Sequence, residues 1–295
     1  MGRLFFVQML VCWFFLVAVY GEEEHYFLKV VPPKVVGKAV LVEMYFSKER
    51  KIPENGYYLQ AAWRQRFVEK ILSLPKEGAQ FWRKYLAFEQ FQSYAEGEKP
   101  ERKEVKLQGE VILISPKGEF TYLEGGRVGS LASRLIWQQR GLERYLFWNK
   151  VFYPRESVRV GEMWKIPLAS VAKVLRLPLQ MVEEESSRAR GVLKKVWKKG
   201  KSLWGRVEVE VLLKIRERGQ MKGGKVKMKM VREGCVDGGE DWSRGKYELE
   251  VKVVRASGQR DLTMIQRNLA RYSRRPMVED SRKEGRKANG QKLRD

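Results

Sequence analysis

The stretch Val207-Glu208-Val209-Glu210-Val211, within the run from Trp204 to Ile215, decides the fold class of this chain. Valine alternates with glutamate at every position, and a strand points successive side chains to opposite faces of its sheet. The stretch therefore predicts a strand with one apolar face on a core and one charged face in solvent.

Runs of the same kind occur on both sides of this stretch, separated by turns that contain Gly, Pro and charged residues. In the first half they span 37–51, 57–74, 81–94, 104–114 and 120–123, and in the second half 191–198, 225–231 and 246–255. The segment 81–94 also fits helical spacing, and we assign it to a strand because strands and short turns surround it. Together the runs predict two antiparallel meanders that form a curved or half-barrel sheet.

Three other segments have helical spacing. Four leucines between positions 131 and 146 lie on one stripe, which predicts an amphipathic helix from Ser130 to Phe147, capped by Ser130. A shorter helix is expected at 168–175, before Pro178, and a last one could form at 262–272. We thus expect a mainly β (α+β) protein, in which a central amphipathic helix and short helices pack on the sheet.

This organisation divides the chain into six segments. They are a signal peptide (1–21), an N-terminal β half (22–128), a helical connector (129–178), a C-terminal β half (179–258), a possible helix (259–275) and a disordered basic tail (276–295). The tail is assigned because it is polar, charged and nearly free of apolar anchors.

The leader predicts where the protein goes. Arg3 precedes the apolar run 4–20, and glutamates follow Gly21, so we expect export to the periplasm or the exterior with cleavage after Gly21. The alternative is a retained anchor, but a span needs roughly 20 apolar residues, and this run is shorter and contains Gln8. Cleavage would also remove Cys12. Cys235 would then be alone, as a structural thiol or, less favoured, in an intermolecular disulfide.

The chain is strongly basic. Its formal net charge is +23, and loss of Arg3 with the leader leaves +22. Such a protein is drawn to polyanions, and export favours anionic lipids or acidic envelope polysaccharides over nucleic acid. Basic clusters occur at 194–201 and 222–229. In the second, Lys225, Lys227 and Lys229 alternate with apolar residues, which favours a solvated strand face over a dedicated binding patch.

No motif with catalytic, cofactor or metal chemistry meets its structural requirements. Ser170 and Lys173 have S-x-x-K spacing without the companion motifs of penicillin-recognising enzymes, and Gly200-Lys201-Ser202 lacks the upstream glycine of a phosphate loop. His25 is the only histidine and lies near the expected mature terminus, a poor place for a general base. Residues 237–241 are at most a loose calcium loop. We therefore assign no catalytic, cofactor or metal residue.

The junction from Pro154 to Pro167 has the pattern P-x-x-x-V-x-V-G-x-x-W-x-I-P. It resembles the corresponding junction of a group of exported bacterial β-rich proteins with no assigned activity, and the order of elements agrees from about Arg66 to Arg255. The resemblance implies the architecture and no reaction. Gly161 is expected to form a turn, and Trp164 to have a packing role rather than a binding role.

Three functions remain open on these grounds. The first is a non-enzymatic exported envelope protein that binds an apolar or amphiphilic ligand or acts as a scaffold, suggested by aromatic residues on alternating strands and helices available as a lid. The second is an adhesion or assembly module that binds anionic envelope polymers. The third, least favoured, is a hydrolase that works through carboxylates. An open apolar groove would favour the first, and a filled core the second.

Overall fold

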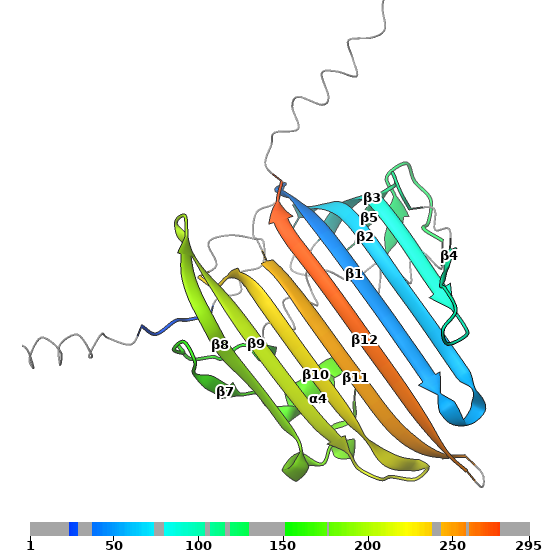
Figure 1. Ribbon diagram of the computed structural model, residues 1–295. Helices are drawn as coiled ribbons and strands as arrows, with labels where there is room; N and C mark the ends of the chain where they lie inside the picture. Colours follow the sequence, from blue (N-terminus) through cyan, green and yellow to red (C-terminus); the bar gives the residue numbers. More distant parts are fainter. Residues whose placement is uncertain are drawn as a thin grey trace, which may run out of the picture.

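The computed structural model describes residues 24–28, 37–73, 80–103, 107–115, 119–129, 151–175, 177–237, 243–257 and 260–277. These residues form one large antiparallel sheet of twelve strands, drawn face-on in Figure 1, with short helices behind it. The mainly β class expected from the sequence is thus confirmed. The predicted helix 130–147, the leader and the tail beyond residue 277 lie outside the described residues.

The first meander contains β1 (Ala39–Ile52), η1 (Pro53–Asn55), β2 (Tyr57–Ser73), β3 (Gln80–Ser93), β4 (Glu101–Lys103), β5 (Val111–Ile114) and β6 (Phe120–Tyr122). After it come β7 (Met163–Lys165), α4 (Leu168–Leu175), η2 (Leu179–Met181) and η3 (Glu184–Ser186). The second meander contains β8 (Arg188–Lys199), β9 (Ser202–Ile215), β10 (Met221–Cys235), β11 (Ser243–Ser257) and β12 (Arg260–Pro276).

The two meanders form a single sheet because β1, the first strand of the chain, pairs with β12, the last strand of the chain. β1 runs antiparallel to β12 from Val40↔Pro276 to Lys51↔Ile265, so the strand order is β6-β5-β3-β2-β1-β12-β11-β10-β9-β8-β7. Although β6 and β7 are consecutive along the chain, they lie at opposite edges of the sheet. Pairing between β1 and β12 therefore joins the two β halves that the sequence suggested.

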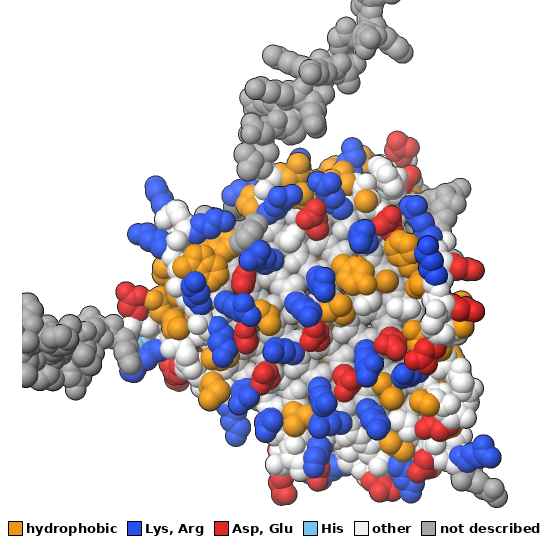
Figure 2. Space-filling model, in the orientation of Figure 1, with side chains coloured by type: hydrophobic (Ala, Val, Ile, Leu, Met, Phe, Trp, Pro, Cys, Tyr) orange, Lys and Arg blue, Asp and Glu red, His pale blue; other side chains and the backbone are white. Residues whose placement is uncertain are grey.

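The two faces of the sheet differ as the alternation in β9 predicts. The covered face, defined by Val207, Val209, Val226 and Met228, packs against α4 and the segment 151–182 in one hydrophobic cluster. A second cluster on the covered side involves β1, β2, β3, β5 and β6. The open face, defined by Glu208, Glu210, Lys227 and Lys229, is turned towards the viewer in Figure 1 and is densely charged in Figure 2.

The prediction of a helix at 262–272 is wrong. These residues lie in β12, which pairs with β1 on one side and β11 on the other along almost its whole length. Hydrogen bonds from two neighbouring strands outweigh a local helical spacing, which by itself provides weak stabilisation. The helix predicted at Leu168–Leu175, in contrast, is present as α4.

The run 104–114 was expected to be one strand and instead contains a turn. Leu107, Gln108 and Gly109 separate β4 from β5, and Gly109 has a φ of 87°. Its N–H donates to the carbonyl of Tyr85 on β3 at 2.8 Å. Glycine reaches this left-handed region without steric cost, so the chain reverses here.

Trp164 has the packing role that its context suggested. Its ring lies over Gly191, where an added Cβ would be 2.2 Å from the ring, and its indole N–H donates to the carbonyl of Phe152 at 2.8 Å. Gly161, with a φ of 87°, forms the turn before it. The junction therefore holds the short edge strand β7 against β8.

A buried ion cluster links the two meanders. Glu69 on β2 accepts a hydrogen bond from Arg83 Nε on β3 at 3.1 Å and another from Arg274 Nη1 on β12 at 3.0 Å. Burial alone would raise the pKa of Glu69, but the two guanidinium groups outweigh this effect and lower it. The cluster thus fixes β12, the last strand of the chain, against β2 and β3, across the intervening β1.

Candidate functional site

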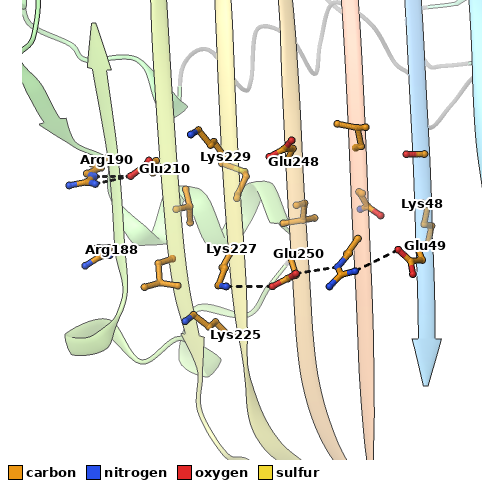
Figure 3. Close-up of a pocket in the computed structure, with 18 of the residues that line it drawn as sticks. Lys48, Glu49, Arg188, Arg190, Glu210, Lys225, Lys227, Lys229, Glu248 and Glu250 are labelled. Carbon is orange, nitrogen blue, oxygen red and sulfur yellow. Dashed lines mark hydrogen bonds and ion pairs between the residues drawn. The ribbon is translucent and has the colours of Figure 1, made fainter. Parts of the chain in front are cut away.

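The open face contains a shallow hollow of about 750 Å³ that crosses β8 to β12 and the ends of β1 and β2. Figure 3 shows it from close by. Its charged lining on the open face consists of Arg188, Arg190, Lys225, Lys227, Lys229, Arg267, Glu49, Glu210, Glu248 and Glu250. Cations outnumber carboxylates, and the two are interleaved across the strands.

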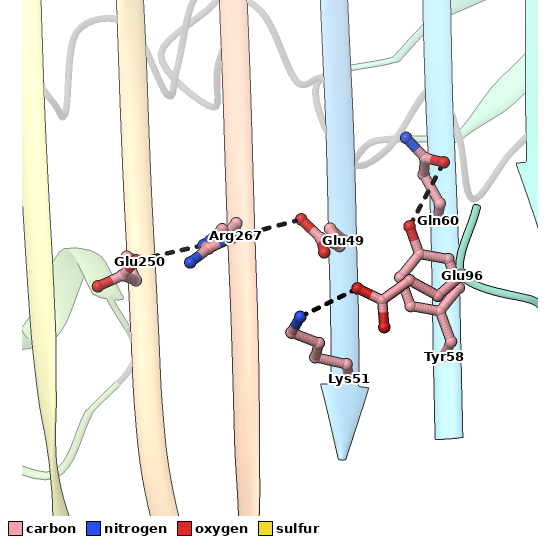
Figure 4. A network of polar contacts seen from close by, with 7 residues as sticks. All are labelled: Glu49, Lys51, Tyr58, Gln60, Glu96, Glu250 and Arg267. Carbon is pink, nitrogen blue, oxygen red and sulfur yellow. Dashed lines mark hydrogen bonds and ion pairs between the residues drawn. The ribbon is translucent and has the colours of Figure 1, made fainter. Parts of the chain in front are cut away.

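One row of the hollow is a chain of ion pairs across four strands. Glu250 on β11 lies 3.6 Å from Lys227 Nζ on β10 and 3.3 Å from Arg267 Nε on β12. Arg267 in turn lies 4.0 Å from Glu49 on β1 (Figures 3 and 4). The register places these residues directly opposite one another, where opposite charges stabilise a sheet modestly.

The same polar network continues towards β2 (Figure 4). Lys51 Nζ lies 3.2 Å from Glu96, and the Tyr58 hydroxyl donates to Gln60 Oε1 at 3.5 Å. Burial, followed by the charges of Glu49 and Glu96, raises the pKa of Tyr58. Tyr58 is thus a neutral hydrogen-bonding group at this end of the face.

A second row is fixed by Glu210. Arg190 on β8 donates to its Oε2 through Nε at 3.2 Å and through Nη2 at 2.7 Å. This hydrogen bonding, more than the charge of Arg190, lowers the pKa of Glu210. The carboxylate is therefore held in its ionised form as part of the scaffold, unlike a general acid, whose pKa must be raised.

Three lysines lie in a row across β9, β10 and β11, and of these Lys225 lines the hollow (Figure 3). Lys214 on β9 lies directly opposite Lys225 on β10, which lies directly opposite Lys252 on β11. All three are exposed, and among the described residues no carboxylate forms an ion pair with Lys214 or Lys225, whereas the carboxylate of Glu54 interacts electrostatically with Lys252. Like charges directly opposite on neighbouring strands destabilise a sheet. We call these residues the lysine row.

The sequence identified part of this arrangement. It placed Lys225, Lys227 and Lys229 on one solvated face of a strand, and the structure confirms that orientation, with Val226 and Met228 buried on the other face. Lys214 and Lys252 were missed, because their place beside Lys225 follows from strand register. Both lysines occupy polar positions within predicted strands. This is the one signal in the sequence that could have placed them on the open face.

The other predicted basic cluster forms a hairpin, which we call the basic hairpin (Lys194–Lys201). Gly200, with a φ of 61°, and Lys201 form the turn between β8 and β9, so Gly200-Lys201-Ser202 is a hairpin turn rather than a phosphate loop. Trp197 lies opposite Trp204, with ring centroids 6.3 Å apart. Lys199 Nζ is 4.5 Å from the centre of the Trp204 ring.

The remaining candidate residues stay apart from the hollow. Ser170 and Lys173 lie on α4 behind the sheet, and His25 accepts a hydrogen bond from Arg159 Nε at 2.8 Å in an exposed position. Cys235 is buried, and its Sγ lies 2.8 Å from Asp237 Oδ1. The other oxygen of Asp237 accepts from the Leu203 N–H at 2.6 Å, which engages this carboxylate in holding the chain after β10.

No group of His, Cys, Asp or Glu within the described ranges could hold a metal ion. In the same part of the chain, no helix is long and apolar enough to cross a bilayer. Comparisons with protein-family models, curated proteins and solved structures give no match. The resemblance at Pro154–Pro167 therefore remains a prediction.

Proposed function

We propose that the protein is a binding or assembly module that holds an anionic envelope polymer on its open face. The observation that carries this proposal is the lysine row, Lys214, Lys225 and Lys252. Three cations opposite one another on adjacent strands cost stability in the free protein, and a bound polyanion would relieve that repulsion.

The geometry supports an extended, repeating anion rather than a single small one. Neighbouring strands are about 5 Å apart, so the row offers cations at a regular spacing across roughly 10 Å. Arg188 and Lys229 extend the positive surface along the hollow. A polymer with an anionic group on each repeating unit can contact several of these cations together.

The two other functions have less support. An apolar ligand would require an open apolar groove, whereas the described apolar side chains of the covered face pack into two clusters and the hollow is charged. A carboxylate-based hydrolase would require glutamates free to transfer protons. The four glutamates of the hollow instead lie in ion pairs with Arg190, Lys227, Lys246 and Arg267.

The test compares two triple variants that remove the same charge. In the row variant, Lys214, Lys225 and Lys252 are replaced by Gln; in the control, the exposed residues Lys38, Lys165 and Lys173 are replaced. Calorimetric titration with polygalacturonate and with dextran sulfate at physiological salt should show about tenfold weaker binding for the row variant, since each exposed ion pair contributes about 0.2–1 kcal/mol. The control should bind as the wild type does.

Two results would count against this function. Equal loss in both triple variants would mean that net charge, rather than the lysine row, attracts the polymer. Single-stranded DNA that binds the row more tightly than either polysaccharide would redirect the proposal to nucleic acid.

A further inference from the structure

The basic hairpin lies in a stretch of the sequence that has many basic residues and no acidic one, although Arg190 and Arg206 near its ends pair with glutamates of neighbouring strands. Between Arg188 and Arg206 the sequence has eight basic residues and no acidic one. They are Arg188, Arg190, Lys194, Lys195, Lys198, Lys199, Lys201 and Arg206. The five lysines of the hairpin are exposed, so positive charge surrounds its tip.

The tip also carries an aromatic pair. Trp204 is fully buried, whereas Trp197 is half-buried and lies directly opposite it on the neighbouring strand. Lys195 Nζ lies 6.0 Å from the centre of the Trp197 ring. A tryptophan on a rigid base, ringed by lysines, is the combination that favours the boundary between lipid headgroups and acyl chains.

Protection of an edge strand explains only part of this composition. Of the twelve residues of β8, β7 pairs with Arg190, Gly191 and Val192, so the segment from Lys194 to Lys199 has no strand beyond it among the described residues. Lysines on such an edge prevent pairing with other chains. That role requires neither a half-exposed Trp197 nor the additional Lys201 in the turn.

We propose that the basic hairpin docks on an anionic lipid bilayer, with its lysines at the headgroups and Trp197 in the interface. This surface is separate from the lysine row, because Lys201 directly precedes β9 and Lys214 lies near its other end, 13 residues later in the sequence. At about 3.3 Å per residue, the two ends are roughly 40 Å apart. Membrane docking by the hairpin would leave the lower end of the open face accessible to a polymer.

The strength expected of this contact is set by the charge at the tip. Each lysine near an anionic surface contributes about 1 kcal/mol, which is about a fivefold gain in affinity. Three lysines removed from the tip should therefore weaken binding about a hundredfold. Salt should weaken it too, because these exposed charges are screened.

The experiment is vesicle sedimentation with the full chain. Vesicles of phosphatidylcholine alone are compared with vesicles that contain about one third phosphatidylglycerol. The neutral vesicles report binding through the apolar run 4–20, and the difference reports the anionic surface. In the hairpin variant, Lys194, Lys198 and Lys201 are replaced by Gln, which spares Lys195 and Lys199 over the indole rings. The row variant defined above is the matched control.

We expect the wild type and the row variant to prefer anionic vesicles equally, and the hairpin variant to lose about a hundredfold in that preference. A Trp197→Phe variant should lack the blue shift of tryptophan emission that the wild type shows on binding. The proposal is overturned if the hairpin variant binds within twofold of the wild type, if the row variant loses as much, or if the wild type has no preference for anionic vesicles. Polymer binding by the hairpin variant should be unchanged, so failure of this proposal is distinguishable from failure of the polymer function.

Discussion

Glu69→Gln is expected to destabilise the protein by about 3–5 kcal/mol at neutral pH. The substitution keeps the shape of the side chain but removes the carboxylate that is ion-paired with both Arg83 and Arg274. The Arg83 side chain is 1% exposed and that of Arg274 is 10% exposed, so water cannot replace the carboxylate at Arg83. The removal of one partner from a buried pair leaves an uncompensated buried charge, which costs about this much.

The measurement is equilibrium unfolding in urea, followed by tryptophan fluorescence and circular dichroism. Glu210→Gln is the matched control. It removes a carboxylate that is also hydrogen-bonded to an arginine, at 2.7 Å, but both side chains are 49% exposed. An exposed pair of this kind contributes less than about 1 kcal/mol. If Glu69→Gln lowers the free energy of unfolding by less than about 1 kcal/mol, the argument is refuted that the cluster excludes water and that Glu69 compensates its buried positive charge.

The pH dependence follows from the direction of the shift. The pKa of Glu69 is lower in the folded than in the unfolded state, so ionised Glu69 stabilises the fold above the unfolded value of about 4.3. That stabilisation is lost as the pH falls through the lower, folded pKa. The difference in unfolding free energy between wild type and Glu69→Gln should therefore be constant near neutrality and shrink below about pH 4. A difference that shrinks between pH 8 and 6 would contradict this assignment.

Three further predictions concern other parts of the sheet. Lys225→Glu should raise the free energy of unfolding by about 0.2–1 kcal/mol, because it replaces like charges with opposite charges across two strand pairs. The same substitution should weaken polymer binding. A variant with a lower free energy of unfolding would contradict the argument that the three lysines repel one another. Gly191→Ala should lower the melting temperature, since its Cβ would lie 2.2 Å from the Trp164 ring and overpacking costs about 1–3 kcal/mol. Gly129→Ala is the control and should leave the melting temperature unchanged, because no atom lies within 4 Å of the added Cβ. Cys235, at 3% exposed, should react with a thiol reagent only as fast as the protein opens, and reaction at the rate of a free thiol would contradict its burial.

The strands could be predicted because their signal is local. Alternation in Val207–Val211 and in Lys225–Met230 follows from the period of two that a sheet imposes, and Gly200 marks a turn that only a flexible residue makes easily. The predicted helix at 262–272 failed for the opposite reason. Its local spacing is ambiguous, and hydrogen bonds from β1 and β11 decide its conformation.

The candidate sites also differ in whether the sequence reveals them or only the folded structure does. The lysines of β10 and the basic hairpin are visible in the sequence because each cluster is contiguous. The lysine row is not, because Lys214, Lys225 and Lys252 come together only when β9, β10 and β11 take one particular register. Glu69, Arg83 and Arg274 gave no signal at all, since a charged residue within a strand does not reveal its partner on a distant strand.

From the sequence alone it follows that this chain forms strands with one charged and one apolar face, that its surface is strongly basic, and where several of its turns lie. The pairing of β1 with β12, which joins the two meanders in one sheet, and the choice of charges that lie opposite one another are known only from the folded structure. The two kinds of feature depend on interactions of different range along the chain. Side-chain alternation and turn conformation depend on a few neighbouring residues, whereas strand order and register depend on packing between segments up to more than two hundred residues apart.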